Sequence, residues 1–114
     1  MARGSRASYG GRRAASRGAD AAAKLPVCSV LPAITGTKTQ GETLTCSTGT
    51  WSNTPDAYSY QWFRSGLKIT GATAATKVLA VGDVGHTMTC TVKATNLGVS
   101  AVATSAATTA VQGL

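Results

Sequence analysis

Three segments of the chain, residues 43–47, 58–62 and 87–95, alternate between apolar and polar side chains. Successive side chains of a β-strand point to opposite faces, so this alternation predicts half-buried strands. In the third segment threonine fills most of the polar positions, and this β-branched polar residue suits the solvent face of a strand. Glycine-containing turn signals separate the segments, and no stretch of more than ten residues after Leu25 carries a helical apolar stripe. We therefore predict an all-β domain.

The spacing of Cys46, Trp62 and Cys90 narrows the prediction to one architecture. In an immunoglobulin-like sandwich, two cysteines on facing sheets lie across the core and a tryptophan packs over them. The sequence before Cys90, Asp83-Val84-Gly85-His86-Thr87-Met88-Thr89, is typical of the turn and strand that carry the second cysteine. Met88 occupies the position of the usual corner tyrosine, so we expect it to fill that space by packing alone. The prediction is an immunoglobulin-like Greek-key β-sandwich.

The redox state of the cysteines stays open at this point. A Cys46–Cys90 bridge would stabilise the fold by roughly 4 kcal/mol. Two unpaired, buried thiols are the alternative, because a reducing compartment does not allow the bond. Cys28 is left over as an odd thiol, predicted either as a small buried side chain on a first strand or as a link to a neighbouring subunit.

The first 25 residues differ from the rest in composition and are predicted to be a separate anchoring arm, followed by the domain at residues 26–114. Six basic groups against one acid, Asp20, give the arm a net charge of +5. It is rich in Gly, Ser and Ala and has no branched aliphatic residue before Leu25, so by itself it cannot bury enough surface to fold. Its charge calls for an acidic partner. The predicted anchoring residues are Arg3, Arg6, Arg12, Arg13, Arg17 and Lys24.

The sequence offers no set of residues for catalysis. His86 is the only histidine, and its expected place is a solvated turn close to Asp83. The four carboxylates are scattered, and three cysteines without a CxxC motif do not make a zinc site. We predict a non-enzymatic protein without cofactor or metal. No apolar run is long enough to span a bilayer, and the N-terminus lacks the apolar stretch of a secretory signal, although its composition is similar to that of an organellar transit peptide.

Two aromatic residues are candidates for a surface contact. Trp62 belongs to the predicted core, and Trp51 is expected to close that core. Phe63 alternates away from Trp62, and with Tyr58 it is predicted to form a small patch for a glycan or a neighbouring subunit.

Residues 27–112 resemble the bacterial and phage immunoglobulin-like domain family. The resemblance rests on residues 31–36 (LPAITG), 41–51 (GETLTCSTGTW), 60–62 (YQW), 69–73 (ITGAT) and 91–96 (TVKATN). A single domain of this kind behind a short basic segment is similar to the capsid decoration proteins, also called cement or head-fibre proteins, of tailed bacteriophages. In those proteins the N-terminal part binds the shell and the immunoglobulin-like part projects.

The resemblance implies a structural virion protein on the outer surface of the capsid. Its partners would be coat subunits (the major capsid protein), and neighbouring copies of itself and host surface glycans are further candidates. No membrane partner is expected. A cell-envelope adhesion or carbohydrate-binding domain is the alternative. A nucleic-acid-binding assembly factor is a further alternative that the sequence favours less, because the arm lacks Arg-Gly-Gly repeats and has one aromatic residue for stacking.

Overall fold

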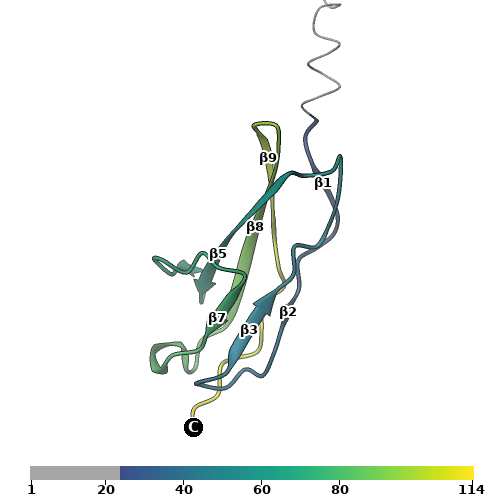
Figure 1. Ribbon diagram of the computed structural model, residues 1–114. Helices are drawn as coiled ribbons and strands as arrows, with labels where there is room; N and C mark the ends of the chain where they lie inside the picture. The colour runs from purple at the N-terminus through teal and green to yellow at the C-terminus, as the bar shows by residue number, and fades with distance from the viewer. Residues whose placement is uncertain (1–23) are drawn as a thin grey trace, which may run out of the picture.

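The computed structural model describes residues 24–114, which fold into nine β-strands and a single turn of 3-10 helix (Figure 1). The elements are β1 (Val27–Val30), β2 (Ile34–Thr35), β3 (Thr43–Cys46), β4 (Thr50–Ser52), β5 (Ala57–Arg64), β6 (Leu67–Lys68), β7 (Thr76–Val78), η2 (Val81–Asp83), β8 (Met88–Asn96) and β9 (Val99–Thr104). The alternating segments of the sequence correspond to β3, β5 and β8, so the predicted all-β domain is confirmed.

Two antiparallel sheets form the layers of a sandwich. One contains three strands in the order β2-β3-β7, and the other contains four in the order β6-β5-β8-β9. The chain passes from β3 in the first sheet to β5 in the second, returns to β7, and crosses again to β8. This is the Greek-key connection of an immunoglobulin-like sandwich. The remaining strands, β1 and β4, pair with each other as a separate two-stranded sheet.

The core lies between the sheets and is formed by the inward positions of the alternating strands. β3 buries Leu44 and Cys46, while β8 buries Met88, Cys90, Val92 and Ala94. Trp62 is fully buried and lies opposite Cys90 in the β5–β8 register, and its indole Nε1 donates a hydrogen bond to the Ala74 carbonyl over 2.7 Å. The predicted packing of Met88 is confirmed, because no part of its side chain is exposed.

The first strand lies at the start of the predicted domain. The sequence predicted a first strand carrying Cys28 and a domain that begins at residue 26. The strand is present as β1, and it pairs with β4 across a shift in register between Cys28 and Val30. The Lys24 and Leu25 carbonyls, just before it, also accept hydrogen bonds from the domain.

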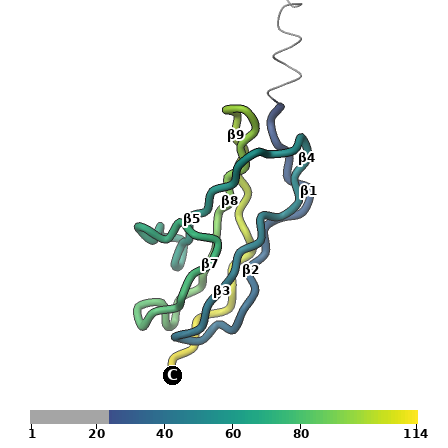
Figure 2. The backbone as a smooth tube through the Cα atoms, in the orientation of Figure 1, coloured from purple at the N-terminus to yellow at the C-terminus, as the bar shows by residue number. Residues whose placement is uncertain are grey.

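The two ends of the sandwich are different in composition. One end consists of residues 24–27, the β4–β5 connection at residues 53–56 and the β8–β9 turn at residues 97–98; we call it the arm-side pole. The C-terminus lies at the opposite end together with η2 and the turn at residues 84–87, and we call this end the far pole (Figures 1 and 2). The predicted anchoring residues before Lys24, which are Arg3, Arg6, Arg12, Arg13 and Arg17, lie outside the described residues.

Candidate functional site

A pair of asparagines holds the start of the described chain against the arm-side pole. The side chain of Asn96, buried at the end of β8, donates from Nδ2 to the Lys24 carbonyl over 2.9 Å and to the Asn53 carbonyl over 2.7 Å. Asn53 in turn donates from its own Nδ2 to the Leu25 carbonyl over 2.8 Å. Both protons of the Asn96 amide are therefore used, and the backbone at residues 24 and 25 has a fixed position. We call this pair the asparagine clamp.

The β8–β9 turn stands next to the clamp. Asn96 and Val99 are paired across the hairpin, so the turn consists of Leu97 and Gly98. Both have positive φ, 48° and 90°, the combination that a type I′ turn requires. The Leu97 N–H donates to the Asp56 carboxylate over 3.0 Å, which ties the turn to the β4–β5 connection. The turn, the connection and the chain entry thus form one hydrogen-bonded unit.

Cys28, the odd thiol at the junction, is half-buried on β1. Its Sγ donates to the Val30 carbonyl over 3.1 Å, and it lies opposite Trp51 in the β1–β4 register. Trp51 packs against the core, as predicted, and donates from Nε1 to the Thr48 carbonyl over 2.6 Å. A link from Cys28 to another subunit stays a prediction.

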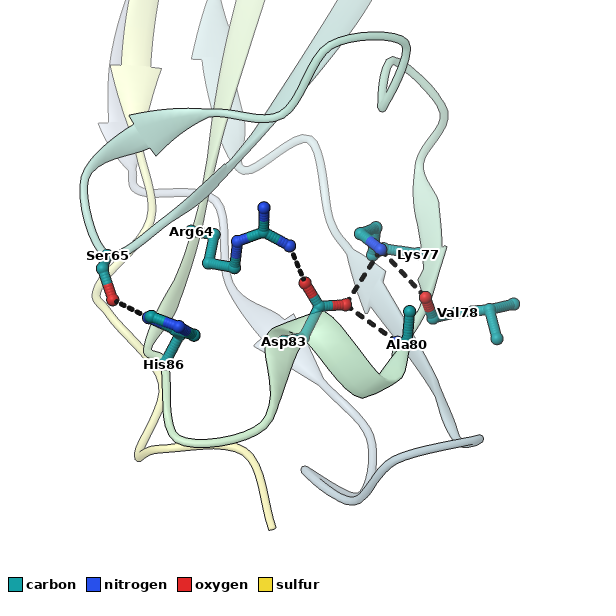
Figure 3. A network of polar contacts seen from close by, with 7 residues as sticks. All are labelled: Arg64, Ser65, Lys77, Val78, Ala80, Asp83 and His86. Atoms are coloured by element: carbon teal, nitrogen blue, oxygen red, sulfur yellow. Dashed lines mark hydrogen bonds and ion pairs between the residues drawn. The ribbon is translucent and has the colours of Figure 1, made fainter. Parts of the chain in front are cut away.

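At the far pole, Asp83 lies fully buried between two cations (Figure 3). Its carboxylate accepts from Arg64 Nη1 at 2.9 Å, from Lys77 Nζ at 3.1 Å and from the Ala80 N–H at 2.9 Å. Burial by itself would raise the pKa of Asp83, but the Ala80 hydrogen bond and the Lys77 and Arg64 side chains outweigh it and hold that pKa below its ordinary value. This network joins β5, β7 and η2 at the far pole, and both oxygens of the Asp83 carboxylate have a hydrogen-bond partner.

His86 lies exposed in the turn before β8, where the sequence predicted it. Its Nδ1 is 2.8 Å from the Ser65 hydroxyl (Figure 3). The Asp83 carboxylate points toward Arg64 and Lys77 instead of toward the imidazole, so within residues 24–114 serine and histidine form a pair without an acid to orient the ring. This geometry lacks the third member of a nucleophilic triad.

The core cysteines are adjacent free thiols in this structure. Cys46 and Cys90 are both buried and belong to the same core cluster as Trp62. Hydrogen bonding to Cys46 and burial both raise the pKa of Cys90, while the same hydrogen bond lowers the pKa of Cys46 against the effect of burial. The two thiols face each other across the core, and a bridge between them stays a prediction.

The structure does not bring Tyr58 and Phe63 together, so the predicted contact patch is wrong. Both belong to β5, whose pairing with β8 is continuous from Ala57 to Arg64. Residues separated by an odd number of positions lie on opposite faces of a strand. Tyr58 shares the inward face with Trp62 near the arm-side pole, whereas Phe63 lies on the outward face near the other end of the strand.

A shallow groove of about 350 Å³ lies between residues 31–34 and 106–109. Lys38 is its one ionisable lining residue, which leaves it without a pair of groups for acid–base chemistry. Within residues 24–114, no three His, Cys, Asp or Glu side chains are grouped closely enough to hold a metal ion. No helix in that part of the chain is long and apolar enough to cross a membrane.

Comparison with known proteins adds no family assignment. No family model matches the chain, and no curated protein matches it.

Sequence reasoning missed the two polar groups that organise the poles. The partners in the asparagine clamp are separated by up to 72 residues, and Arg64 is 19 residues from Asp83. Residues so far apart in the chain form no short sequence motif that could have identified these contacts. One signal was present at residues 96–98, where leucine stands in a turn position that usually holds asparagine or glycine.

Proposed function

We propose that the protein is a structural component of a virion that decorates the outer surface of the capsid. In this proposal, residues 1–25 bind the coat subunits and the immunoglobulin-like domain projects outward. The class of partner comes from the resemblance to phage decoration proteins. The division of roles comes from the charge, since the arm carries six of the eleven basic residues of the chain.

The observation that carries the proposal is the geometry of the chain entry. The asparagine clamp holds residues 24 and 25 at the arm-side pole, and the C-terminus lies at the far pole (Figure 1). A support bound through the arm is therefore next to one end of the domain, and the other end points away from it. An arm that entered through a free linker would leave the domain without a defined orientation.

The chemistry of the arm suits a repetitive acidic surface. Arginine forms bidentate, charge-assisted hydrogen bonds with carboxylates, which are shorter and stronger than neutral ones. The domain itself contributes little attraction: residues 26–114 hold five basic residues against three acids. One of those acids, Asp83, already pairs with two of the cations. A symmetric shell offers many equivalent sites, so many copies of the protein can bind one particle.

The test compares charge removal in the arm with equal charge removal in the domain. One variant carries Arg3→Gln, Arg6→Gln and Arg12→Gln; its matched control carries Lys38→Gln, Lys68→Gln and Lys93→Gln. Cosedimentation with empty shells assembled from the coat protein of the same genome measures binding. We expect the arm variant to lose roughly tenfold or more in affinity, with a loss that grows at low salt, because exposed ion pairs contribute up to about 1 kcal/mol each.

Removal of residues 1–23 is expected to abolish cosedimentation, while the domain control binds like the unchanged protein. Equal losses in the two triple variants would contradict a specific arm. Undiminished binding after the deletion would refute anchoring altogether. Binding to double-stranded DNA that equals binding to shells would favour the nucleic-acid alternative, because phosphate contacts give the same salt dependence.

A further inference from the structure

The arm-side pole exposes three large apolar side chains. Leu25, Val27 and Leu97 are 54%, 56% and 59% exposed, although the domain has a core that could shelter such residues. Pro26, between the first two, is buried, so Leu25 and Val27 point to the same outer side of an extended segment. Asn96 brings the two groups together: its side chain donates a hydrogen bond to the Lys24 carbonyl, and Leu97 is the next residue in the chain. The apolar residues therefore surround the arm entry.

Leu97 occupies its position against two physical preferences. A φ of 48° places a side chain with a Cβ in the left-handed region, where asparagine and glycine are favoured and leucine is strained. The side chain is also mostly in water at the tip of a hairpin. No contact within residues 24–114 accounts for leucine there. An exposed and strained apolar residue is explained when something outside the domain covers it.

Backbone strain of this kind is concentrated at the same pole. Four residues other than glycine have positive φ in the described chain, namely Asn53, Thr54, Ser65 and Leu97. Three of them belong to the arm-side pole. Thr54 is β-branched, for which a φ of 46° is a clear outlier. The fourth, Ser65, has a partner at the other end of the molecule in His86.

We infer that the arm-side pole is itself a binding surface. Its exposed apolar side chains contact the coat protein next to the place where the arm binds. This inference depends on the proposed function and adds a second, apolar contact to it. The chain outside the described part ends at this pole, at residue 23. Consecutive Cα atoms are about 3.8 Å apart, so an arm bound as far as Lys24 places Leu25 directly at the partner. The asparagine clamp then keeps Leu97 at that surface.

Charge favours a protein shell over a second copy of the chain. A second copy docked pole to pole would bring two arms, each with six basic groups and one acid, close together. Like charges disfavour that arrangement, whereas a carboxylate-rich coat surface attracts both arms and accommodates the apolar residues between them.

The test is Leu97→Asn in the full chain, with Leu67→Asn as its matched control. Leu67 is 74% exposed on β6, away from the arm-side pole. We expect Leu97→Asn to weaken binding to the coat-protein shells about tenfold, since an apolar contact is lost, and to leave the salt dependence unchanged. The same variant should raise the Tm of the free protein by several degrees, because asparagine tolerates the positive φ. Leu67→Asn should change neither the affinity nor its salt dependence.

The outcomes separate this inference from the proposed function. If deletion of residues 1–23 abolishes binding and Leu97→Asn binds like the unchanged protein, the arm is confirmed and the apolar contact is refuted. If the deletion has no effect, the proposed function itself fails. Dimerisation of the free protein that disappears in Leu97→Asn would overturn the inference in favour of a second copy. Binding to phosphatidylserine-containing vesicles that depends on Leu97 would overturn it in favour of a membrane.

Discussion

The two poles of the sandwich differ in how their polar groups are paired and in which side chains they expose. At the far pole, a buried carboxylate has three donors, and the neighbouring histidine and serine satisfy each other. At the arm-side pole, the polar groups hold the incoming chain, while leucine and valine side chains face water and the backbone is strained. The far pole pairs its polar groups within the domain, although Val78 and Val81 face water there too. The arm-side pole combines exposed apolar side chains with three of the four non-glycine residues at positive φ. We therefore expect the largest loss of stability from substitution at the far pole and the loss of binding from substitution at the arm-side pole.

The largest effect on stability is expected from Asp83→Asn at the far pole. The change leaves Arg64 and Lys77 without their counter-charge, and breaking a buried ion pair destabilises strongly. Arg64 is 39% exposed and can turn to water, so we expect a loss of about 3 kcal/mol in the free energy of unfolding, at the lower end of the usual range. Urea unfolding measures it, with Glu42→Gln as an exposed acidic control. A loss equal to that of the control would show that the network is not structural.

The same residue predicts the acid sensitivity of the fold. The pKa of Asp83 in the folded state lies below its ordinary value of 3.8, because the Ala80 N–H and the two cations outweigh the effect of burial. Its stabilisation is therefore fully present above about pH 4 and is lost as the pH falls through the folded-state pKa. In Asp83→Asn, the urea midpoint should fall less steeply below that pH. An unchanged slope would contradict the lowered pKa.

A smaller effect is expected from Asn96→Leu at the arm-side pole. The variant leaves the Lys24 and Asn53 carbonyls without their donor, which should lower the free energy of unfolding by about 2 kcal/mol. Residues 24 and 25 should also be released, so trypsin should cut after Lys24 faster than in the unchanged protein. Asn53→Gly is the graded control, because it removes one hydrogen bond and fits the positive φ. Equal cleavage rates in all three proteins would show that the clamp does not hold the arm entry.

The smallest expected effect has the opposite sign. Thr54→Asn relieves the strain of a β-branched residue at positive φ and should raise the free energy of unfolding by about 1 kcal/mol. Ser65→Asn places the same residue at a similar φ at the far pole but removes the hydrogen bond to His86, so no net gain is expected there. Thermal unfolding measures both. A gain at Ser65 as large as that at Thr54 would weaken the contrast between the poles.

The fold was predictable because its determinants are local. Alternation along residues 43–47 and 87–95 assigned the buried faces of β3 and β8 correctly, and the spacing of Cys46, Trp62 and Cys90 identified the two facing sheets. The separate pairing of β1 with β4 was not predicted, because its register shift and short length leave no periodic pattern.

The site was less predictable because its contacts join distant parts of the chain. No local rule connects Asn96 to Lys24 or Arg64 to Asp83. The predicted patch of Tyr58 and Phe63, in contrast, could have been rejected from the sequence, since an odd separation on one strand puts two side chains on opposite faces. The arm residues before Lys24 lie outside the described part, and their role stays a prediction.

The position of the C-terminus has a practical consequence. The last turn of chain is held by backbone hydrogen bonds from Val111 to His86 and from Gln112 to Lys38, after which Leu114 is 96% exposed. Any polypeptide joined after Leu114, natural or engineered, would start at the end away from the arm. Under the proposed function, an enzyme or antigen fused there would be presented on the outside of the particle, with its attachment point away from the support.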